Sequence, residues 1–242
     1  MNILILGANG MLGPYVVKAL QHKHRLRLTD INEYEDPVHE YFKLDIGDQE
    51  SVVKAAEGMD VIINLSVLRH ERDLAFKVNA MGTYNAMVAA VRNGIKRVIN
   101  TGPHFTLAGP TYEWIDYQIG PDIPPQPGTN LYAITKSLGQ ETCRIFSENH
   151  DIEVITLLFY HFLDDKPDTS RYGQDLTPYA ITWSDAAEAF EPAITIDADL
   201  LPSKCETFFV FTDLPHGRFS NEKAKKILGW EPKNNLKQIW TK

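Results

Sequence analysis

Tyr132 and Lys136 are four residues apart, near the start of a helix that the pattern predicts over residues 131–149. The i, i+4 spacing places both side chains on one face of that helix, within reach of the same ligand. A nearby ammonium group favours the phenolate and lowers the proton affinity of the tyrosine toward that of a general base. The pair therefore predicts proton transfer at a hydroxyl group, with Tyr132 as the base.

A second chemical signal is the glycine-rich segment Gly7-Ala-Asn-Gly-Met-Leu-Gly13, which stands between a predicted apolar strand at 2–6 and a helical pattern at 12–21. Glycines in such a turn let the backbone approach a pyrophosphate, and the helix N-terminus offers free N–H groups to it. The segment therefore predicts a dinucleotide site. The residues that we expect to contact the cofactor here are Gly7, Asn9, Gly10, Met11, Leu12 and Gly13.

Asp30 narrows the choice of dinucleotide. It ends a predicted strand at 25–29 and lies roughly 20 residues beyond the glycines, where a carboxylate can accept hydrogen bonds from the adenosine ribose. Such a carboxylate would repel a 2′-phosphate, so NAD is favoured over NADP, and Ile31 is a further expected cofactor contact. Arg25 and Arg27 keep NADP open as an alternative.

Composition limits the classes of function. The chain has 242 residues, 43% of them hydrophobic, and 24 basic against 32 acidic residues give a net charge of −8. With no cluster of Lys or Arg, we expect no nucleic-acid partner. No apolar run approaches the roughly 18 residues that span a bilayer, and the chain begins in its first strand, so we expect neither membrane segment nor signal peptide. Two cysteines, Cys143 and Cys205, fit neither a disulfide framework nor a metal site, which favours the cytoplasm.

The order of the elements predicts the fold. Strand patterns at 2–6, 25–29, 40–44, 60–65, 96–101 and 153–159 alternate with helical patterns at 12–21, 49–57, 72–93 and 131–149. This alternation indicates an α/β fold with a doubly wound parallel (Rossmann) sheet. We assign residues 1–160 to this core, including a substrate loop at 102–130, and residues 161–242 to a small C-terminal substrate lobe within one compact unit. That lobe is expected to hold a helix at 183–190, a strand at 207–212 and a helix at 221–228.

Several motifs together carry a resemblance to a known family. GANGMLG, Asp30, LDIGD at 44–48, NLS at 64–66, VNAMGTYN at 78–85, YAITK and LGWEP resemble the extended short-chain dehydrogenases/reductases of the NAD-dependent epimerase/dehydratase group. The resemblance implies that Asp45 and Ile46 flank the adenine, that Leu65 and Ser66 line the nicotinamide side, that Asn79 holds backbone and water, and that Lys136 binds the nicotinamide ribose. It also implies a homodimer through helices 72–93 and 131–149.

Within this group the segment from Asn100 to Arg171 is most similar to uronate dehydrogenases. That similarity implies oxidation of a small sugar or sugar acid at its anomeric hydroxyl. It also implies that His104 contacts the substrate and that Arg171 holds a sugar carboxylate, to which a guanidinium can donate two hydrogen bonds. The expected substrate-binding residues are Val67, Gly102, His104, Tyr160 and Arg171.

One departure from the family concerns the turn after the fifth strand. The family places Ser or Thr there beside the reacting hydroxyl, whereas this chain has Gly102, with Thr101 one residue earlier. Either Thr101 or Thr106 reaches in, in which case Thr101 is the expected catalytic residue, or the hydroxyl is absent. Two alternatives to a dehydrogenase therefore stay open: a nucleotide-sugar epimerase or dehydratase with tightly bound NAD, and a weakly catalytic NAD-binding protein.

Overall fold

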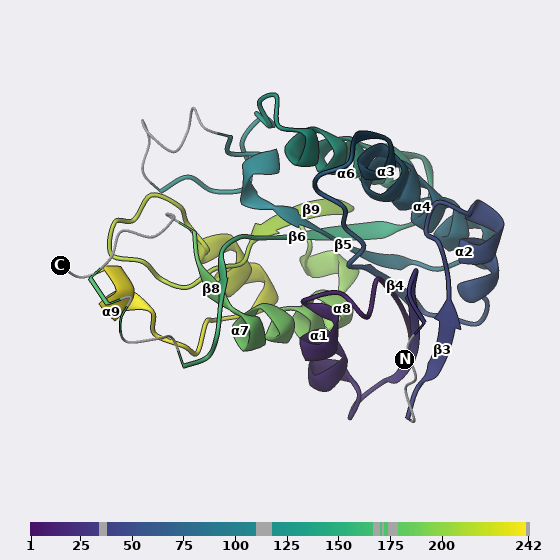
Figure 1. Ribbon diagram of the computed structural model, residues 1–242, viewed down its shortest axis with the longest axis horizontal. Coiled ribbons are helices and arrows are strands. Elements are labelled where there is room, and N and C mark those ends of the chain that lie inside the picture. Colours follow the sequence, from purple (N-terminus) through teal and green to yellow (C-terminus); the bar gives the residue numbers. More distant parts are fainter. Residues whose placement is uncertain (34–37, 110–117, 167–169, 171, 174–178, 241–242) are drawn as a thin grey trace.

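The computed structural model describes residues 1–33, 38–109, 118–166, 170, 172–173 and 179–240. In this part of the chain the main sheet has seven parallel strands in the order β3-β2-β1-β4-β5-β6-β9 (Figure 1). Their bounds are β1 Asn2–Leu6, β2 Arg25–Asp30, β3 Glu40–Lys43, β4 Val61–Asn64, β5 Arg97–Pro103, β6 Glu153–Phe159 and β9 Cys205–Phe209. The doubly wound parallel sheet predicted from the sequence is confirmed.

Helices cover both faces of this sheet. Figure 1 shows α2, α3, α4 and α6 on one side and α1, α7 and α8 on the other. Their bounds are α1 Gly13–Leu20, α2 Gln49–Ala55, α3 Arg72–Ala75, α4 Gly82–Asn93, α6 Leu131–Asn149, α7 Trp183–Glu188, α8 Phe190–Thr195 and α9 Lys237–Trp240. None of the described helices has the length and apolar character needed to cross a membrane.

Strand β1 needs a continuous apolar sequence because both of its faces are buried. Successive side chains of a strand point to opposite faces, so Ile3 and Ile5 belong to the core under α1, α7 and α8, whereas Leu4 and Leu6 belong to the core under α2, α4 and α6. All four are fully buried. A strand with a polar face could not occupy this central position.

The helix predicted over residues 72–93 contains a π-helical turn, Phe76–Met81, between α3 and α4. Turns of this kind are rare and occur mainly at functional sites. Here the turn carries Asn79, which is fully buried. A Cβ at Gly139 of α6 would lie 2.8 Å from the carbonyl oxygen of Asn79, so α6 can pack closely against this turn only because residue 139 is glycine.

The segment after residue 160 is joined to the core by main-chain pairing. Its strand β9 is parallel to β6 and ends the main sheet, while the two-residue strands β7 Phe162–Leu163 and β8 Ile181–Thr182 form a separate pair. The helix expected at 221–228 is a π-helical turn, Ala224–Leu228, which ends at Gly229 with a φ of +65°.

The loop predicted to bind substrate begins with the 3₁₀ turn His104–Thr106 and returns through a bridge between Ala108 and Gln126. Its aromatic residues Tyr112, Trp114 and Tyr117 lie outside the described residues.

Asp185 of α7 fixes the C-terminal segment to the core. Its carboxylate is 1% exposed and accepts hydrogen bonds from the backbone N–H of Lys233 at 3.0 Å and of Asn234 at 2.9 Å. The indole of Trp230 donates to the Asp185 carbonyl at 3.0 Å. Asp185 therefore holds Trp230 of LGWEP through its carbonyl and the two residues that follow LGWEP through its carboxylate.

We predict that Asp185→Ala lowers the free energy of unfolding by about 1–3 kcal/mol, because two backbone N–H groups lose a buried, charged acceptor. Urea denaturation followed by tryptophan fluorescence measures this change. Asp199→Ala, at an exposed position, is the matched control and should stay within about 0.5 kcal/mol of the parent protein. Equal unfolding free energies for the Asp185→Ala protein and the control would contradict the assignment.

Candidate active site

The glycine turn has the geometry that a pyrophosphate site needs. Gly7 has a φ of +78°, and a Cβ there would lie 2.9 Å from the Cα of Ser66. A Cβ at Gly13 would lie 1.9 Å from the carbonyl oxygen of Ala8, so only glycine lets α1 begin this close to β1. The N-terminus of α1 and Gly10 face the cavity described below. These residues fit a dinucleotide phosphate, which binds at such helix N-termini.

Asp30 lies beside this turn at the carboxyl end of β2. Its Oδ2 accepts a hydrogen bond from the backbone N–H of Asn9 at 3.1 Å, and its Oδ1 accepts one from Asn32 at 3.2 Å. Arg27 is held by Glu40 and by two carbonyls after α2, and Arg25 begins β2 at the end away from Asp30. The arginines that kept NADP open are therefore not placed to bind a 2′-phosphate at Asp30.

Asp45 and Ile46, expected to flank the adenine, follow β3 on the same edge of the sheet. Asp45 accepts hydrogen bonds from Lys77 Nζ at 2.5 Å and from the backbone of Gly47 at 2.8 Å. Burial raises the pKa of the Asp45 carboxyl, but the hydrogen bonds from Lys77 and Gly47 and the Lys77 charge hold it below its ordinary value. The carbonyl of Ile46 accepts from Asn85 at 2.8 Å. Together with the exposed Ile31, these residues form the edge beyond the glycine turn.

Lys136 joins three elements at the reacting end of the site. From α6 its Nζ donates to the carbonyl of Ser66 at 2.8 Å and to the carbonyl of Thr101 at 3.0 Å. Burial, with the nearby charge of Arg69, lowers the pKa of Lys136 to about 8. An ammonium has three N–H groups, and the two carbonyls use two of them. The third suits a ribose hydroxyl.

Tyr132 lines the cavity one helical turn before Lys136. The pKa of the Tyr132 phenol lies above its ordinary value, chiefly because the group is buried. The charge of Arg69 and a hydrogen bond from its guanidinium lower this pKa and offset part of the effect of burial, whereas Tyr160 raises it. The sequence argument assigned the activating charge to Lys136. In the structure the cation that faces the Tyr132 ring is Arg69, whose Cζ lies 5.5 Å from the ring centre and which was not among the residues expected from the sequence.

The turn that departs from the family has no free hydroxyl among its described residues. Thr101 donates its hydroxyl to the carbonyl of Asn64 at 2.8 Å, and Thr106 donates to the carbonyl of Pro103 at 3.0 Å. A Cβ at Gly102 would lie 3.0 Å from Nε2 of Gln140, whose amide donates to Thr106 at 2.9 Å. The space where a side chain at position 102 would point is therefore taken by this amide.

The residues expected to bind substrate have different surroundings. Val67, Gly102 and Tyr160 line the cavity. His104 is 1% exposed, is stacked on Tyr179 with ring centroids 4.4 Å apart, and is not among the described residues that line the cavity. Its ring also contacts Phe105 and Tyr160, which line the cavity, and its contact with substrate stays a prediction. Arg171 lies outside the described residues.

The cavity has a volume of about 650 Å³ and extends from the glycine turn to Tyr132. Of the expected cofactor and catalytic residues it is lined by Gly7, Gly10, Met11, Leu12, Gly13, Leu65, Thr101, Tyr132 and Lys136. The sequence reasoning missed several further lining residues: Arg69, His70, Phe105, Asn130, His161, Phe162 and Trp183. Arg69 and His70 could have been found, because they follow the predicted strand at 60–65 at the sheet's carboxyl edge. Trp183 comes from α7, and no local pattern signals its approach.

The model of the NAD dependent epimerase/dehydratase family matches residues 3–181, about three quarters of the chain. The chain belongs to this family. The match confirms the prediction of an NAD-dependent enzyme of this group, made from the glycine turn, Asp30 and the Tyr132–Lys136 pair. It is consistent with a dinucleotide held at the turn from Gly7 to Gly13.

Individual relatives are more distant. The chain is 23% identical to the NAD-dependent glucose-6-phosphate dehydrogenase of Haloferax volcanii, over 96% of this chain and 93% of the relative. It is 27% identical to the L-arabinose 1-dehydrogenase (NAD(P)(+)) of the same organism, over 64% of this chain and 65% of the relative. A crystal structure of uronate dehydrogenase from Agrobacterium tumefaciens has the same fold, with a TM-score of 0.79 at 23% identity, covering 97% of this chain and 85% of that one.

We predict that Gly13→Ala weakens binding of NAD by at least about tenfold, or about 1.4 kcal/mol, because the added Cβ must push the start of α1 away from Ala8. Isothermal titration calorimetry measures the Kd. Gly120→Ala is the matched control, since a Cβ there meets nothing within 4 Å. An unchanged Kd in a folded Gly13→Ala protein would remove the glycine turn from the cofactor site.

Proposed function

We propose that this protein is an NAD-dependent dehydrogenase that acts on a hydroxyl group of a small sugar or sugar acid. The observation that carries the proposal is the shared cavity, which has the glycine turn at one end and Tyr132 beside Lys136 at the other. This arrangement would place a cofactor and a general base in the same cavity. Bound NAD would supply the acceptor for a hydride from the substrate carbon.

Each residue has a distinct task in this proposal. The turn from Gly7 to Gly13 would hold the pyrophosphate, and Asp30 would hold the adenosine ribose. Lys136, fixed by two carbonyls, would present its third N–H to the nicotinamide ribose. Tyr132 would accept the proton of the reacting hydroxyl. The Thr101 hydroxyl is bonded to the backbone, so Thr101 would act mainly through the carbonyl that orients Lys136.

The substrate class is supported by two observations. The two relatives described above are named as dehydrogenases of glucose 6-phosphate and of arabinose, and the solved neighbour as a uronate dehydrogenase. The reacting end of the cavity also combines polar groups (Arg69, His70, Tyr160) with the aromatic ring of Phe105. Sugars suit such a site, since their hydroxyl groups need donors and acceptors and their C–H faces pack on aromatic rings.

An epimerase or dehydratase of the same family is the alternative. Such an enzyme keeps its NAD bound and returns the hydride, so it would purify with nearly stoichiometric cofactor and release no NADH. A dehydrogenase would emerge with exchangeable cofactor and accumulate NADH. A weakly catalytic NAD-binding protein would bind the cofactor and do neither.

We predict that Tyr132→Phe lowers kcat by about 10²–10⁴-fold with little change in the Kd for NAD, because it removes only the proton acceptor. A plate of aldoses and uronates with NAD, followed by NADH absorbance, provides the assay. Tyr84→Phe, on the exposed side of α4, is the matched control and should keep the parent rate. Turnover no higher in the parent protein than in Tyr132→Phe would refute the dehydrogenase.

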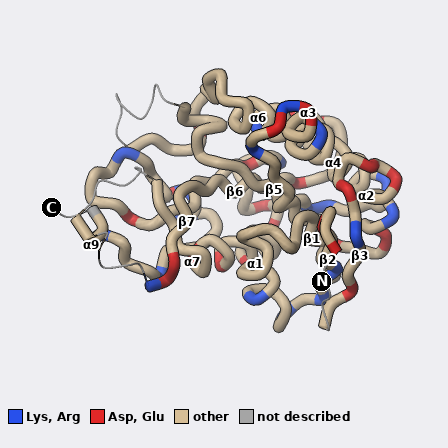
Figure 2. The backbone as a smooth tube through the Cα atoms, in the orientation of Figure 1, with Lys and Arg blue, Asp and Glu red and all other residues tan. Residues whose placement is uncertain are grey.

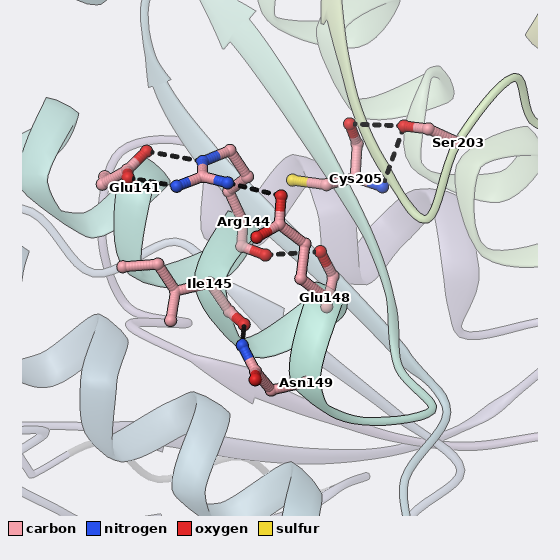
Figure 3. Close-up of polar contacts among 8 residues, drawn as sticks. Glu141, Arg144, Ile145, Glu148, Asn149, Ser203 and Cys205 are labelled. Carbon is pink, nitrogen blue, oxygen red and sulfur yellow. Dashed lines mark hydrogen bonds and ion pairs between the residues drawn. The ribbon is translucent and has the colours of Figure 1, made fainter.

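We propose in addition that two copies pair through α4 and α6. Tyr84, Leu138 and Ile145 are large apolar residues between 45% and 46% exposed, and Tyr84 packs edge-on against Phe146 of α6 at 5.7 Å. Figure 3 shows Arg144 of α6 between Glu141 and Glu148, with Ile145 beside this ion-paired group. An apolar strip bordered by charged pairs is typical of a protein–protein interface.

We predict that the combined change Leu138→Glu and Ile145→Glu converts a dimer to a monomer, because it places two carboxylates in the apolar strip. Sedimentation velocity at micromolar concentration gives the mass. Leu200→Glu, at another exposed position, should leave the mass unchanged. A parent protein that sediments as a monomer would remove the dimer proposal.

We also propose a cytoplasmic location. Cys143 and Cys205 are free thiols, as expected of a protein kept in a reducing compartment.

A further inference from the structure

The loop that follows β4 is anchored at the residue next to Arg69. The side-chain oxygen of Asn79 accepts a hydrogen bond from the Leu68 N–H at 3.0 Å, and its amide donates to the Leu68 carbonyl at 2.6 Å. The same amide donates to Thr135 of α6 at 2.9 Å. Because Asn79 is fully buried, this clamp fixes where the neighbouring Arg69 leaves the backbone. The exposed side chain of Arg69 thus projects from a backbone that is held in place at the preceding residue.

Arg69 is directed at the catalytic tyrosine. Its Cζ lies 5.5 Å from the centre of the Tyr132 ring, within the range of a cation–π contact. Both residues line the same cavity. The guanidinium stays charged at any physiological pH, so it presents a permanent positive charge to the phenol.

Lys136 is less suited to this task. Its Nζ donates to the carbonyls of Ser66 and Thr101, so two of its three N–H groups are directed at the backbone, and burial lowers its pKa to about 8. The hydroxyls of Thr101 and Thr106 donate to backbone carbonyls, and Gly102 has no side chain. Among the described residues of the cavity wall, Arg69 is therefore the cation that meets Tyr132 most directly.

We infer that Arg69 is a positioning residue for the reaction, which holds its guanidinium against the Tyr132 phenol and favours the phenolate in place of the hydroxyl that the turn at Gly102 lacks. The inference rests on the proposed dehydrogenase. In that reaction the O–H bond of the substrate breaks and its proton goes to the phenolate oxygen, while the hydride on the same carbon goes to bound NAD. Arg69 makes the phenolate available but is not itself consumed.

The titratable and charged groups that line the cavity with Tyr132 come from three segments of the chain. The loop after β4 contributes Arg69 and His70, α6 contributes Lys136, and the segment after β6 contributes Tyr160 and His161. Of these, Tyr160 opposes ionisation of Tyr132 and Arg69 favours it. Loss of the Arg69 charge should therefore raise the pKa of Tyr132, and the acid limb of the kcat–pH profile should move to higher pH.

We predict that Arg69→Gln raises the pKa of Tyr132 by about one pH unit, within the range that an opposite charge at this distance produces. Tyrosinate absorbance is titrated in the free protein, and the signal of Tyr132 is obtained by subtracting the matching Tyr132→Phe protein. Arg69→Lys should restore most of the shift because it retains a positive charge. Arg72→Gln is the control, since Arg72 pairs with Asp73 at the start of α3, where acidic and basic positions lie side by side (Figure 2).

The kinetic arm compares the same variants with the best sugar substrate across pH. Arg69→Gln should move the acid limb of the kcat–pH profile to higher pH by the same amount as the pKa of Tyr132. At high pH its kcat should approach that of the parent protein. A rise in KM with an unmoved profile would instead make Arg69 a substrate-binding group and overturn the inference. The inference would also be overturned if the tyrosinate absorbance of Tyr132 developed over the same pH range in the parent and Arg69→Gln proteins, or if it developed in neither protein. Without any sugar turnover in the parent protein, the proposed dehydrogenase fails, while the absorbance titration still decides the role of Arg69.

Discussion

The arrangement of the site depends on the ammonium group of Lys136. Two carbonyls, that of Ser66 in the loop just after β4 and that of Thr101 within β5, accept its hydrogen bonds, so one side chain of α6 is bonded to both segments. A buried charge is tolerated only when it is well hydrogen-bonded, and parallel neighbouring strands supply carbonyls at matching depth. This bond also fixes the register of α6, and with it the position of Tyr132 one turn earlier.

The loop after β4 is held in place by Asn79, which lies in the π-helical turn between α3 and α4. Asn79 is placed by a π-helical turn, and its single amide clamps Leu68 while also reaching Thr135 of α6. The extra residue of the π turn and the missing side chain of Gly139 let these two segments approach. The positive charge that faces the Tyr132 ring therefore comes from Arg69 in the loop after β4. Lys136, on the same helix as Tyr132, donates hydrogen bonds to two backbone carbonyls.

The strands, the glycine turn and the spacing of Tyr132 and Lys136 could be predicted from the sequence because their signals are local. Buried parallel strands must be apolar on both faces, and Ile3 to Leu6 satisfy that requirement within four residues. The turn from Gly7 to Gly13 needs glycine for steric reasons that hold in any such fold, and the spacing of Tyr132 and Lys136 follows from helix geometry. His104 shows the limit of this reasoning, since its motif did not reveal that its ring is buried and stacked on Tyr179, 75 positions further along the chain.

By itself, the sequence determined the parallel α/β sheet, the glycine turn between β1 and α1 and the helix face that Tyr132 and Lys136 share, since each depends on residues close together in the chain. Only the tertiary structure decided which groups meet at that base. Arg69 and Tyr132 are separated by 63 positions along the chain and come together because β4 ends, and α6 begins, at the same edge of the sheet. Likewise, whether a threonine hydroxyl is free or bonded to a neighbouring strand depends on the pairing of β4 with β5, which no local pattern records.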